Sequence, residues 1–240
     1  NLQSTDLKEL VTSSEASFKL TSPFISMTFD YDALKAIDAV NTQGEIVIAA
    51  SAVMDNELSE ADKLLVKDRP VYELTITKGG NKVTSFGEGP VTVIIPYEPK
   101  VGEDYEAIVL YFLSDQGVLQ LVTGNYDEQL KAVVFETNHF SEFVIGYNPI
   151  TFADVTEQAW YKNAVDFVAA RGIASGTGNN RFEPETQLNR ADFVVMLMNT
   201  YASDLEKLSG NQQIGNFDDA GNTYYTDELL TAKRLGLING

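Results

Sequence analysis

The stretch from Gly172 to Phe193 reads Gly-Ile-Ala-Ser-Gly-Thr-Gly-Asn-Asn-Arg-Phe-Glu-Pro-Glu-Thr-Gln-Leu-Asn-Arg-Ala-Asp-Phe. It joins two segments in which apolar residues recur at helical spacing. The first, Gln158–Arg171, is followed by a glycine, which is a typical helix end. The second, Asn189–Ala202, begins with a good N-cap and has Asp192 at its third helical position, a variant of the capping box. The sequence therefore predicts a helix–loop–helix unit.

Three motifs of this unit recur 64 or 65 residues further along the chain. Such recurrence indicates that the rear of the chain is built from similar units. The recurring pairs are Phe152-x-Asp154 with Phe217-x-Asp219, Trp160-Tyr161 with Tyr224-Tyr225, and Gly172-Ile173 with Gly236-Leu237. We predict a front domain at 1–148, a first repeat at 149–215 and a truncated second repeat at 216–240.

The second copy stops at Gly240, before its loop and second helix. The chain starts at Asn1 without a signal peptide, which is typical of a piece of a longer protein. A helix that lacks the partner from its own repeat exposes an apolar face. We therefore expect a homo-oligomer formed through the truncated repeat, and little or no polymer binding by the fragment.

The motifs resemble the S-layer homology family, whose pattern runs from Phe-x-Asp to a Thr-Arg-Ala-Glu-like start of a second helix. Asn189 and Asp192 replace the Thr and Glu of that start and keep its capping chemistry. The resemblance implies a non-enzymatic module that anchors bacterial surface proteins to secondary cell-wall polysaccharide, which is often pyruvylated. The matching residues are Phe152-Ala153-Asp154, Trp160, Gly172-Ile173-Ala174-Ser175-Gly176, Gly178, Phe182-Glu183-Pro184 and Leu188-Asn189-Arg190-Ala191-Asp192-Phe193.

Four residues are candidates for binding this polysaccharide, and each has a structural alternative. Arg190 stands at a helix start, where a cation beside free N–H groups makes an anion site; otherwise it bridges to Asp154 or to a carboxylate of a neighbouring repeat. Trp160 stacks on a sugar or packs in the core. Asp154 lines a groove or caps a loop. Gly176 lies against the ligand or permits the turn. The resemblance implies that the arginine is central to binding.

The front region has the composition of a β-sandwich. Nine short segments rich in β-branched and aromatic residues are separated by turn sequences such as Lys78-Gly79-Gly80-Asn81 and Tyr126-Asp127-Glu128. One helix is predicted at Asp32–Val40, and Leu58–Lys67 fits either a short helix or a loop. The fold class is therefore a mainly β domain, sandwich-like with one or two short helices, followed by a small all-α repeat region. The front region also resembles the β-rich domain that often precedes such repeats.

Composition restricts the function further. The chain has 17 basic and 35 acidic residues, a net charge of −18, which disfavours partners such as nucleic acid and anionic membranes. It has no cysteine and one histidine, so thiol nucleophiles and Cys- or His-rich metal sites are excluded. No Gly-x-Ser-x-Gly nucleophile motif is present. We expect no catalytic residues, no metal and no cofactor, and an extracellular location at the bacterial cell surface.

Two other functions remain open from the sequence. In one, the chain is an assembly module that contacts other surface-layer subunits. In the other, it is an accessory domain of an extracellular glycan-active enzyme. The ligand of the front domain and the identity of the wall polymer do not follow from the residues.

Overall fold

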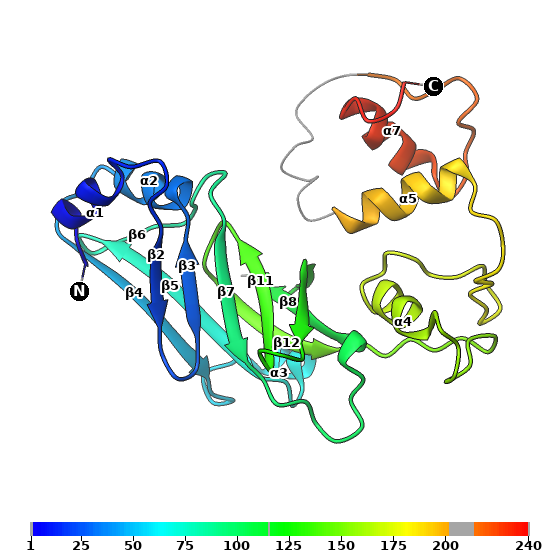
Figure 1. Cartoon of the computed structure of the whole chain (residues 1–240), viewed down its shortest axis with the longest axis horizontal. Helices are drawn as coiled ribbons and strands as arrows, with labels where there is room; N and C mark the ends of the chain where they lie inside the picture. The colour runs from blue at the N-terminus through cyan, green and yellow to red at the C-terminus, as the bar shows by residue number, and fades with distance from the viewer. Residues whose placement is uncertain (1, 115, 202–213, 240) are drawn as a thin grey trace. The chain divides into compact units, whose positions relative to one another are not determined.

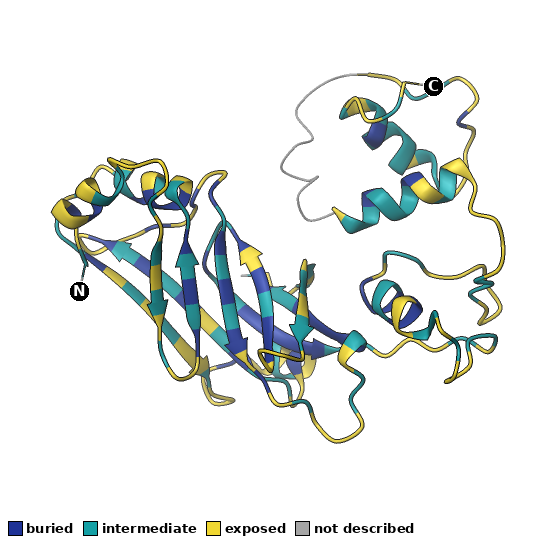
Figure 2. Cartoon of the chain, in the orientation of Figure 1, coloured by how far each residue is buried: buried dark blue, intermediate teal, exposed yellow. Residues whose placement is uncertain are grey.

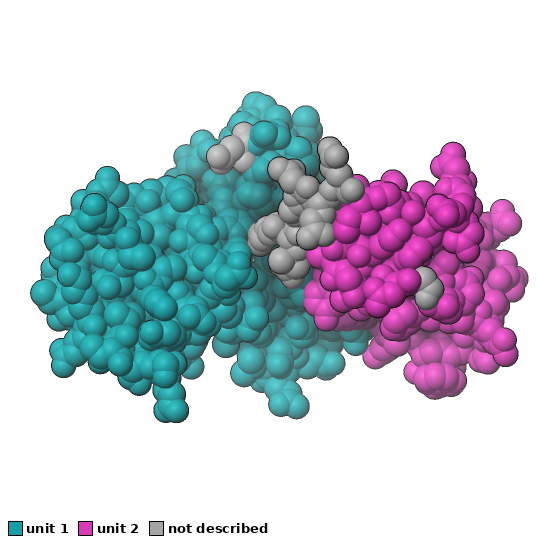
Figure 3. Space-filling model, turned by 90° about the horizontal axis from the view of Figure 1, so that it is seen from above, with its two compact units in different colours: residues 1–146 teal, residues 147–240 magenta. Residues whose placement is uncertain are grey.

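The computed structural model describes residues 2–114, 116–201 and 214–239, and the chain forms two compact units. Figure 3 colours the front unit, Asn1–Gly146, and the rear unit, Tyr147–Gly240. The front unit is built mainly of strands with a few short helices, whereas the rear unit contains helices and loops (Figure 1). The predicted fold class is confirmed.

The front unit contains two antiparallel sheets. Their longest ladder joins eight residues of β4 to all of β5. The first sheet has the order β1 (Leu2–Gln3), β4 (Glu45–Val53), β5 (Val71–Lys78), β12 (Glu142–Tyr147), β8 (Ile108–Leu113), β9 (Leu119–Val122), and β6 (Asn81–Lys82) pairs with β5. The second has the order β10 (Gly124–Asp127), β11 (Ala132–Thr137), β7 (Val91–Pro96), β3 (Ser26–Phe29), β2 (Phe18–Thr21).

Aromatic side chains join the sheets into a sandwich. Phe135 of β11 and Phe143 of β12 come from different sheets, and their ring centroids lie 4.9 Å apart. Phe29 packs on Phe86 and Phe140 with centroids 6.1 and 5.9 Å away. Buried positions alternate along β7, in the period of two that a half-buried strand requires (Figure 2). The core of the front unit therefore lies between the sheets.

Short helices occupy the connections of the front unit. They are α1 (Ser4–Leu10), α2 (Tyr31–Ala39), α3 (Glu60–Val66) and the 3-10 turn η1 (Tyr105–Ala107). In α2 the Asp30 carboxylate accepts the Ala33 N–H at 2.7 Å, and Ala33, Leu34 and Ile37 are buried. The segment Leu58–Lys67, for which the sequence left a helix or a loop open, contains α3. Ser59 caps this helix by accepting the Asp62 N–H at 3.1 Å.

Some predicted boundaries were wrong. The segment from Tyr126 to Asp127 was expected in a turn but belongs to β10, which pairs with β11 from Gly124↔Phe135 to Asp127↔Ala132. Cross-strand pairing here overrides the turn preference of the local sequence. The structure also adds β1, α1 and β6, which the pattern of apolar residues did not indicate.

Lys78 was expected in the same kind of turn but ends β5 and is fully buried. Its Nζ donates to the carbonyl oxygens of Ile37, Asp38 and Val40 at 3.1, 2.6 and 3.1 Å. The Asp38 carboxylate lies 3.5 Å from the same ammonium. A cation thus satisfies the carbonyl groups that a helix C-terminus leaves unpaired.

The rear unit contains α4 (Lys162–Ala170), α5 (Arg190–Thr200) and α7 (Thr226–Arg234). Val194 and Met198 of α5 form a buried cluster with Ala232 of α7, and Leu229, Leu235 and Ile238 pack against it. The helix of the second copy, which was expected to lack a partner, therefore packs on α5.

Both predicted helices of the first repeat are shorter in the structure. The segment from residue 158 to 161 is not in α4, because the Ala159 and Lys162 N–H groups bond three residues back, to Thr156 and Ala159, as in tight turns. The second helix begins as predicted, since the Asn189 side chain accepts the Asp192 N–H at 2.9 Å. It ends at Thr200, and Ala202 lies outside the described residues.

Candidate functional site

Asp154 holds the loop between α4 and α5. One carboxylate oxygen accepts the Phe182 N–H and the other accepts the Glu183 N–H, both at 2.9 Å. Glu183 has a φ of 56°, which is uncommon for a residue with a side chain. The Arg181 guanidinium lies 3.7 Å from the same carboxylate. Asp154 therefore fixes a loop backbone that would otherwise be unfavourable.

Gly176 lies at the start of the same loop with a φ of 76°. A Cβ atom here would overlap the Arg181 carbonyl oxygen and approach Cε1 of Phe152 at 2.8 Å. The Thr177 N–H donates to the Arg181 carbonyl at 2.9 Å and closes the turn. The position therefore requires glycine because the loop backbone folds back onto it.

Acid is expected to release this loop. The Phe182 N–H, with that of Glu183 and the charge of Arg181, holds the pKa of Asp154 below its ordinary value. A carboxyl whose pKa is depressed on folding contributes stability above its unfolded pKa, near 4, and loses it as the pH falls through the folded pKa. The protection of the Phe182 and Glu183 amides, taken as the exchange rate of an unfolded chain divided by the observed rate at the same pH, should therefore fall below about pH 4.

The variant Asp154→Asn is the matched comparison for this prediction. It removes the charge but keeps the size, so both amides should exchange faster at neutral pH, with a weaker pH dependence in acid. Unchanged exchange in the variant would contradict the role of the carboxylate.

Trp160 is exposed rather than packed in the core. Its exposed fraction is 90%, and its described ring contact is with the neighbouring Tyr161, at 5.5 Å between centroids and an interplanar angle of 77°. Core packing, the structural alternative considered for this residue, is wrong. The indole ring is therefore open to contact with a ligand.

Arg190 is the first residue of α5 and is exposed. The bridge to Asp154 considered above is not present, because Asp154 pairs with Arg181. Among the described residues of the rear unit, only Arg190 and Arg234 are cations without a hydrogen bond or ion pair. Arg234 ends α7, where the helix dipole favours a cation, whereas Arg190 begins a helix, where the dipole opposes it.

Sequence reasoning missed Tyr224 as a residue of this site. Its hydroxyl donates to a carboxylate oxygen of Asp192, and that hydrogen bond raises the pKa of Tyr224. Tyr224 therefore lies at the first turn of α5, the turn that begins with Arg190. The repeat contained a signal for it, because Tyr224 occupies the position that corresponds to Trp160.

Corresponding positions of the two copies have the same local geometry. Tyr224 and Tyr225 form an edge-on ring pair at 5.0 Å and 78°, as Trp160 and Tyr161 do. Gly172 and Gly236 both have positive φ, of 64° and 71°. The helix ends share two hydrogen bonds: Gly172 N–H to Ala169 and Ile173 N–H to Val168 in one copy, Gly236 N–H to Lys233 and Leu237 N–H to Ala232 in the other.

The structure does not gather the four predicted residues into one contact network. It joins Asp154 and Gly176 through the loop at Arg181, and it places Arg190 in the first turn of α5, where Asp192 accepts a hydrogen bond from Tyr224. No hydrogen bond or ion pair connects Trp160 to either group in the part of the chain that the structure describes. Within those same ranges no three acidic or histidine side chains gather as a metal site, and no helix is long and apolar enough to cross a membrane.

The rear unit is thus a repeated helix–loop–helix module, and comparison with known proteins names its class. Residues 151–194 match the family model of the S-layer homology domain. This part of the chain is an S-layer homology domain, a non-catalytic domain that anchors proteins at the cell surface. Such domains in general bind secondary cell-wall polymers. The chain is accordingly extracellular and located at the bacterial cell surface.

Three similar proteins have names that describe glycan-active enzymes. An amylopullulanase of Thermoanaerobacterium thermosulfurigenes is 23% identical over 219 residues, which cover 86% of this chain and 11% of that protein. An endo-1,4-beta-xylanase A of Thermoanaerobacterium saccharolyticum and an exoglucanase of Acetivibrio thermocellus are 28% and 27% identical over 92 residues each. Those two matches cover 38% of this chain and 7% and 8% of the two proteins.

This chain therefore spans about a tenth of the length of these relatives. Because the rear unit comprises residues 147–240, the match over 86% of the chain also extends well into the front unit. No solved structure matches the chain significantly.

Proposed function

We propose that the rear unit binds an anionic secondary cell-wall polysaccharide, in particular a pyruvylated one, at the start of α5. The observation that carries the proposal is Arg190, an exposed guanidinium without an ion pair among the described residues, in the first turn of α5. A planar guanidinium binds a carboxylate with two parallel hydrogen bonds. The ketal carboxylate of a pyruvylated sugar can accept both of these hydrogen bonds.

The helix start supplies further donors. The Asn189 side chain accepts a hydrogen bond from the Asp192 N–H, and its backbone carbonyl oxygen accepts one from the Phe193 N–H. The N–H groups of Arg190 and Ala191 have no partner within the described residues, as expected in a first turn. These groups and the helix dipole favour an anion.

We further propose that Trp160 contributes an aromatic face to the same polymer, because indole rings stack on the apolar C–H faces of sugars. Its 90% exposure supports this role. Asp154 and Gly176 shape the loop that precedes α5, and their influence on binding is through that loop. Several such weak contacts on one polymer chain add up to useful affinity.

The variant Arg190→Gln tests the proposal. It keeps hydrogen-bonding capacity but removes the charge. The weak affinity expected of this chain for purified cell-wall sacculi, measured by cosedimentation at high protein concentration, should therefore fall about tenfold or more. The matched control is Arg234→Gln, which removes an equally unpaired cation at a helix C-terminus and should bind like the parent chain. Equal binding by both variants would rule out Arg190 as the anion site.

The chemistry of the polymer is tested with the same assay. Sacculi treated with mild acid lose ketal-linked pyruvate, and the parent chain should then bind them as weakly as Arg190→Gln binds untreated sacculi. Undiminished binding after this treatment would contradict a pyruvylated ligand.

The names of the relatives favour a second role, as the anchoring part of an extracellular glycan-active enzyme. On this proposal the catalytic activity belongs to a larger protein, and the present units retain it at the cell wall. Glycan hydrolysis is measured for whole cells and for their medium, with and without this chain added in excess. The added chain should compete with the enzyme for the cell wall, so part of the activity should move from the cells into the medium.

A further inference from the structure

Two tyrosines form an aromatic pair on the front unit, outside the anchoring domain. The rings of Tyr105, in η1, and Tyr126, in β10, have centroids 5.0 Å apart and are tilted by 40°. Tyr105 is 43% exposed, and Tyr126 is half-buried with its other edge on Tyr97 at 6.4 Å. Neither hydroxyl of the pair has a hydrogen-bond partner within the described residues.

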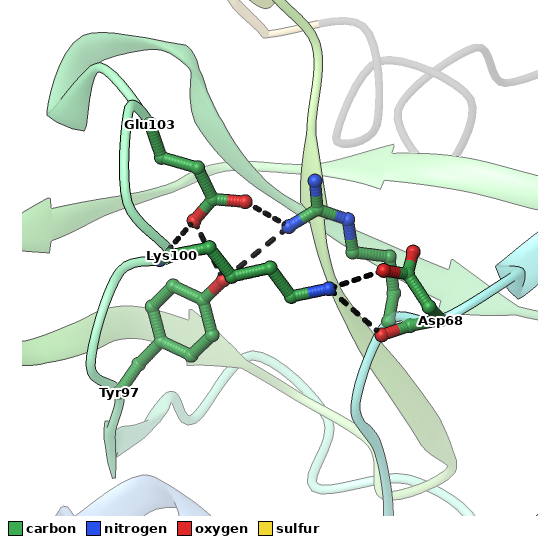
Figure 4. Close-up of polar contacts among 5 residues, drawn as sticks. Asp68, Tyr97, Lys100 and Glu103 are labelled. Carbon is green, nitrogen blue, oxygen red and sulfur yellow. Dashed lines mark hydrogen bonds and ion pairs between the residues drawn. The ribbon is translucent and has the colours of Figure 1, made fainter.

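The loop that presents Tyr105 is held by a polar network (Figure 4). Arg69 NH1 donates to Glu103 and, at 3.3 Å, to the hydroxyl of Tyr97. That hydroxyl donates to Glu103 at 2.8 Å, and the Lys100 N–H donates to the same carboxylate oxygen at 3.0 Å. Lys100 Nζ in turn reaches Asp68 at 2.5 Å. Both ends of the loop are thus tied to the residues that precede β5.

The ionisation states within the network agree with a fixed loop. Burial and the hydrogen bond to Glu103 raise the pKa of Tyr97 to about 12, so it stays a donor. Burial acts to raise the pKa of Glu103, but the hydrogen bonds from Arg69, Lys100 and Tyr97 outweigh it and hold that pKa below its ordinary value. A rigid aromatic surface binds with little loss of conformational entropy.

The charges around the pair decide what kind of ligand fits. Two cations of the network are engaged in ion pairs, Arg69 with Glu103 and Lys100 with Asp68. Glu128, Glu98 and Asp127 lie near enough to add to the effect of burial in raising the pKa of Tyr126. An anionic polymer would be repelled here, whereas the hydroxyl groups of a neutral ligand can donate to these carboxylates.

We propose that the Tyr105–Tyr126 pair is a binding site for a neutral oligosaccharide, which stacks a pyranose ring on Tyr105 and donates hydroxyl hydrogen bonds to the neighbouring carboxylates. Aromatic rings can stack on the apolar C–H faces of sugars, and the partly exposed ring of Tyr105 is available for such a contact. Carboxylates surround this site, whereas the proposed anion site at Arg190 is cationic. The front unit would therefore bind a neutral glycan and the rear unit an anionic one.

Affinity electrophoresis of the full chain tests this in gels that contain soluble starch, xylan or hydroxyethyl cellulose, with polygalacturonate as the anionic probe. At least one neutral polymer should retard the chain, and polygalacturonate should not act through this site. Tyr105→Ala should raise the dissociation constant about tenfold, whereas Tyr105→Phe keeps the ring and should bind as the parent does. Tyr201→Ala removes an exposed tyrosine of the rear unit and is the matched control.

Two results would overturn the proposal: no retardation by any of the three neutral polymers, or equal retardation of the parent and Tyr105→Ala. Thermal unfolding of each variant shows whether the front unit remains folded, and Tyr105→Phe guards against a purely structural effect. Arg190→Gln should leave this retardation unchanged, so failure here is distinct from failure of the proposed wall binding.

Discussion

Replacement of Lys78 with methionine is expected to destabilise the front unit by about 3–5 kcal/mol. The Lys78 ammonium is fully buried and donates to three carbonyl groups at the end of α2, 3.5 Å from the Asp38 carboxylate. Methionine fills nearly the same volume but donates nothing. The substitution would leave a carboxylate and three acceptors without their cation, and a buried polar group without a partner is costly.

Urea denaturation followed by far-ultraviolet circular dichroism measures this loss for the sheet signal of the front unit. Lys82→Met is the matched control, because Lys82 is an exposed lysine on β6, the strand that pairs with β5. It should change the free energy of unfolding by less than about 0.5 kcal/mol. Similar midpoints for the two variants would show that the ammonium does not stabilise α2.

Replacement of Gly176 with alanine is the second change with a large expected effect. The new Cβ would overlap the Arg181 carbonyl oxygen, and the φ of 76° is unfavourable for alanine. We expect the rear unit to lose about 2–3 kcal/mol, through backbone strain and the displaced loop. The Phe182 and Glu183 N–H groups, which bond to Asp154, should lose protection from hydrogen exchange.

Gly178→Ala separates strain from overlap. Gly178 also has a positive φ, of 98°, but a Cβ there meets no atom within 4 Å. The Gly178→Ala variant should therefore be destabilised only by backbone strain, and the exchange of the Phe182 and Glu183 amides should be almost unchanged. If both alanine variants were equally destabilised, close packing at Gly176 would not be the cause.

Much of the architecture follows from local patterns. The alternation of apolar residues along β7 predicts a half-buried strand of a sandwich and is confirmed, whereas two of the expected turn sequences belong in part to strands. The N-cap role of Asn189 also follows from the sequence, because capping involves residues three positions apart. The repeat is visible because the same turn and helix end require the same residues in each copy.

The candidate site was predicted less completely. Arg190 could be singled out because a cation is unusual at a helix start, and the prediction that it binds the polymer remains to be tested. Whether Trp160 is exposed depends on what covers the turn that precedes α4, and no residue near it in sequence decides that. The placement of Tyr224 on Asp192 joins residues 32 positions apart and requires α7 to pack on α5.

The sequence by itself determined the kinds and approximate bounds of most elements, because propensity, capping and periodicity depend on residues that are close in the chain. Its motifs also resemble those of the S-layer homology family. Only the tertiary structure decided that Lys78 caps α2, that Asp154 holds the loop at Phe182 and Glu183, and that Tyr105 meets Tyr126. These contacts join residues from 21 to 41 positions apart. They depend on how whole elements pack, since burial and charge pairing are properties of the assembled unit.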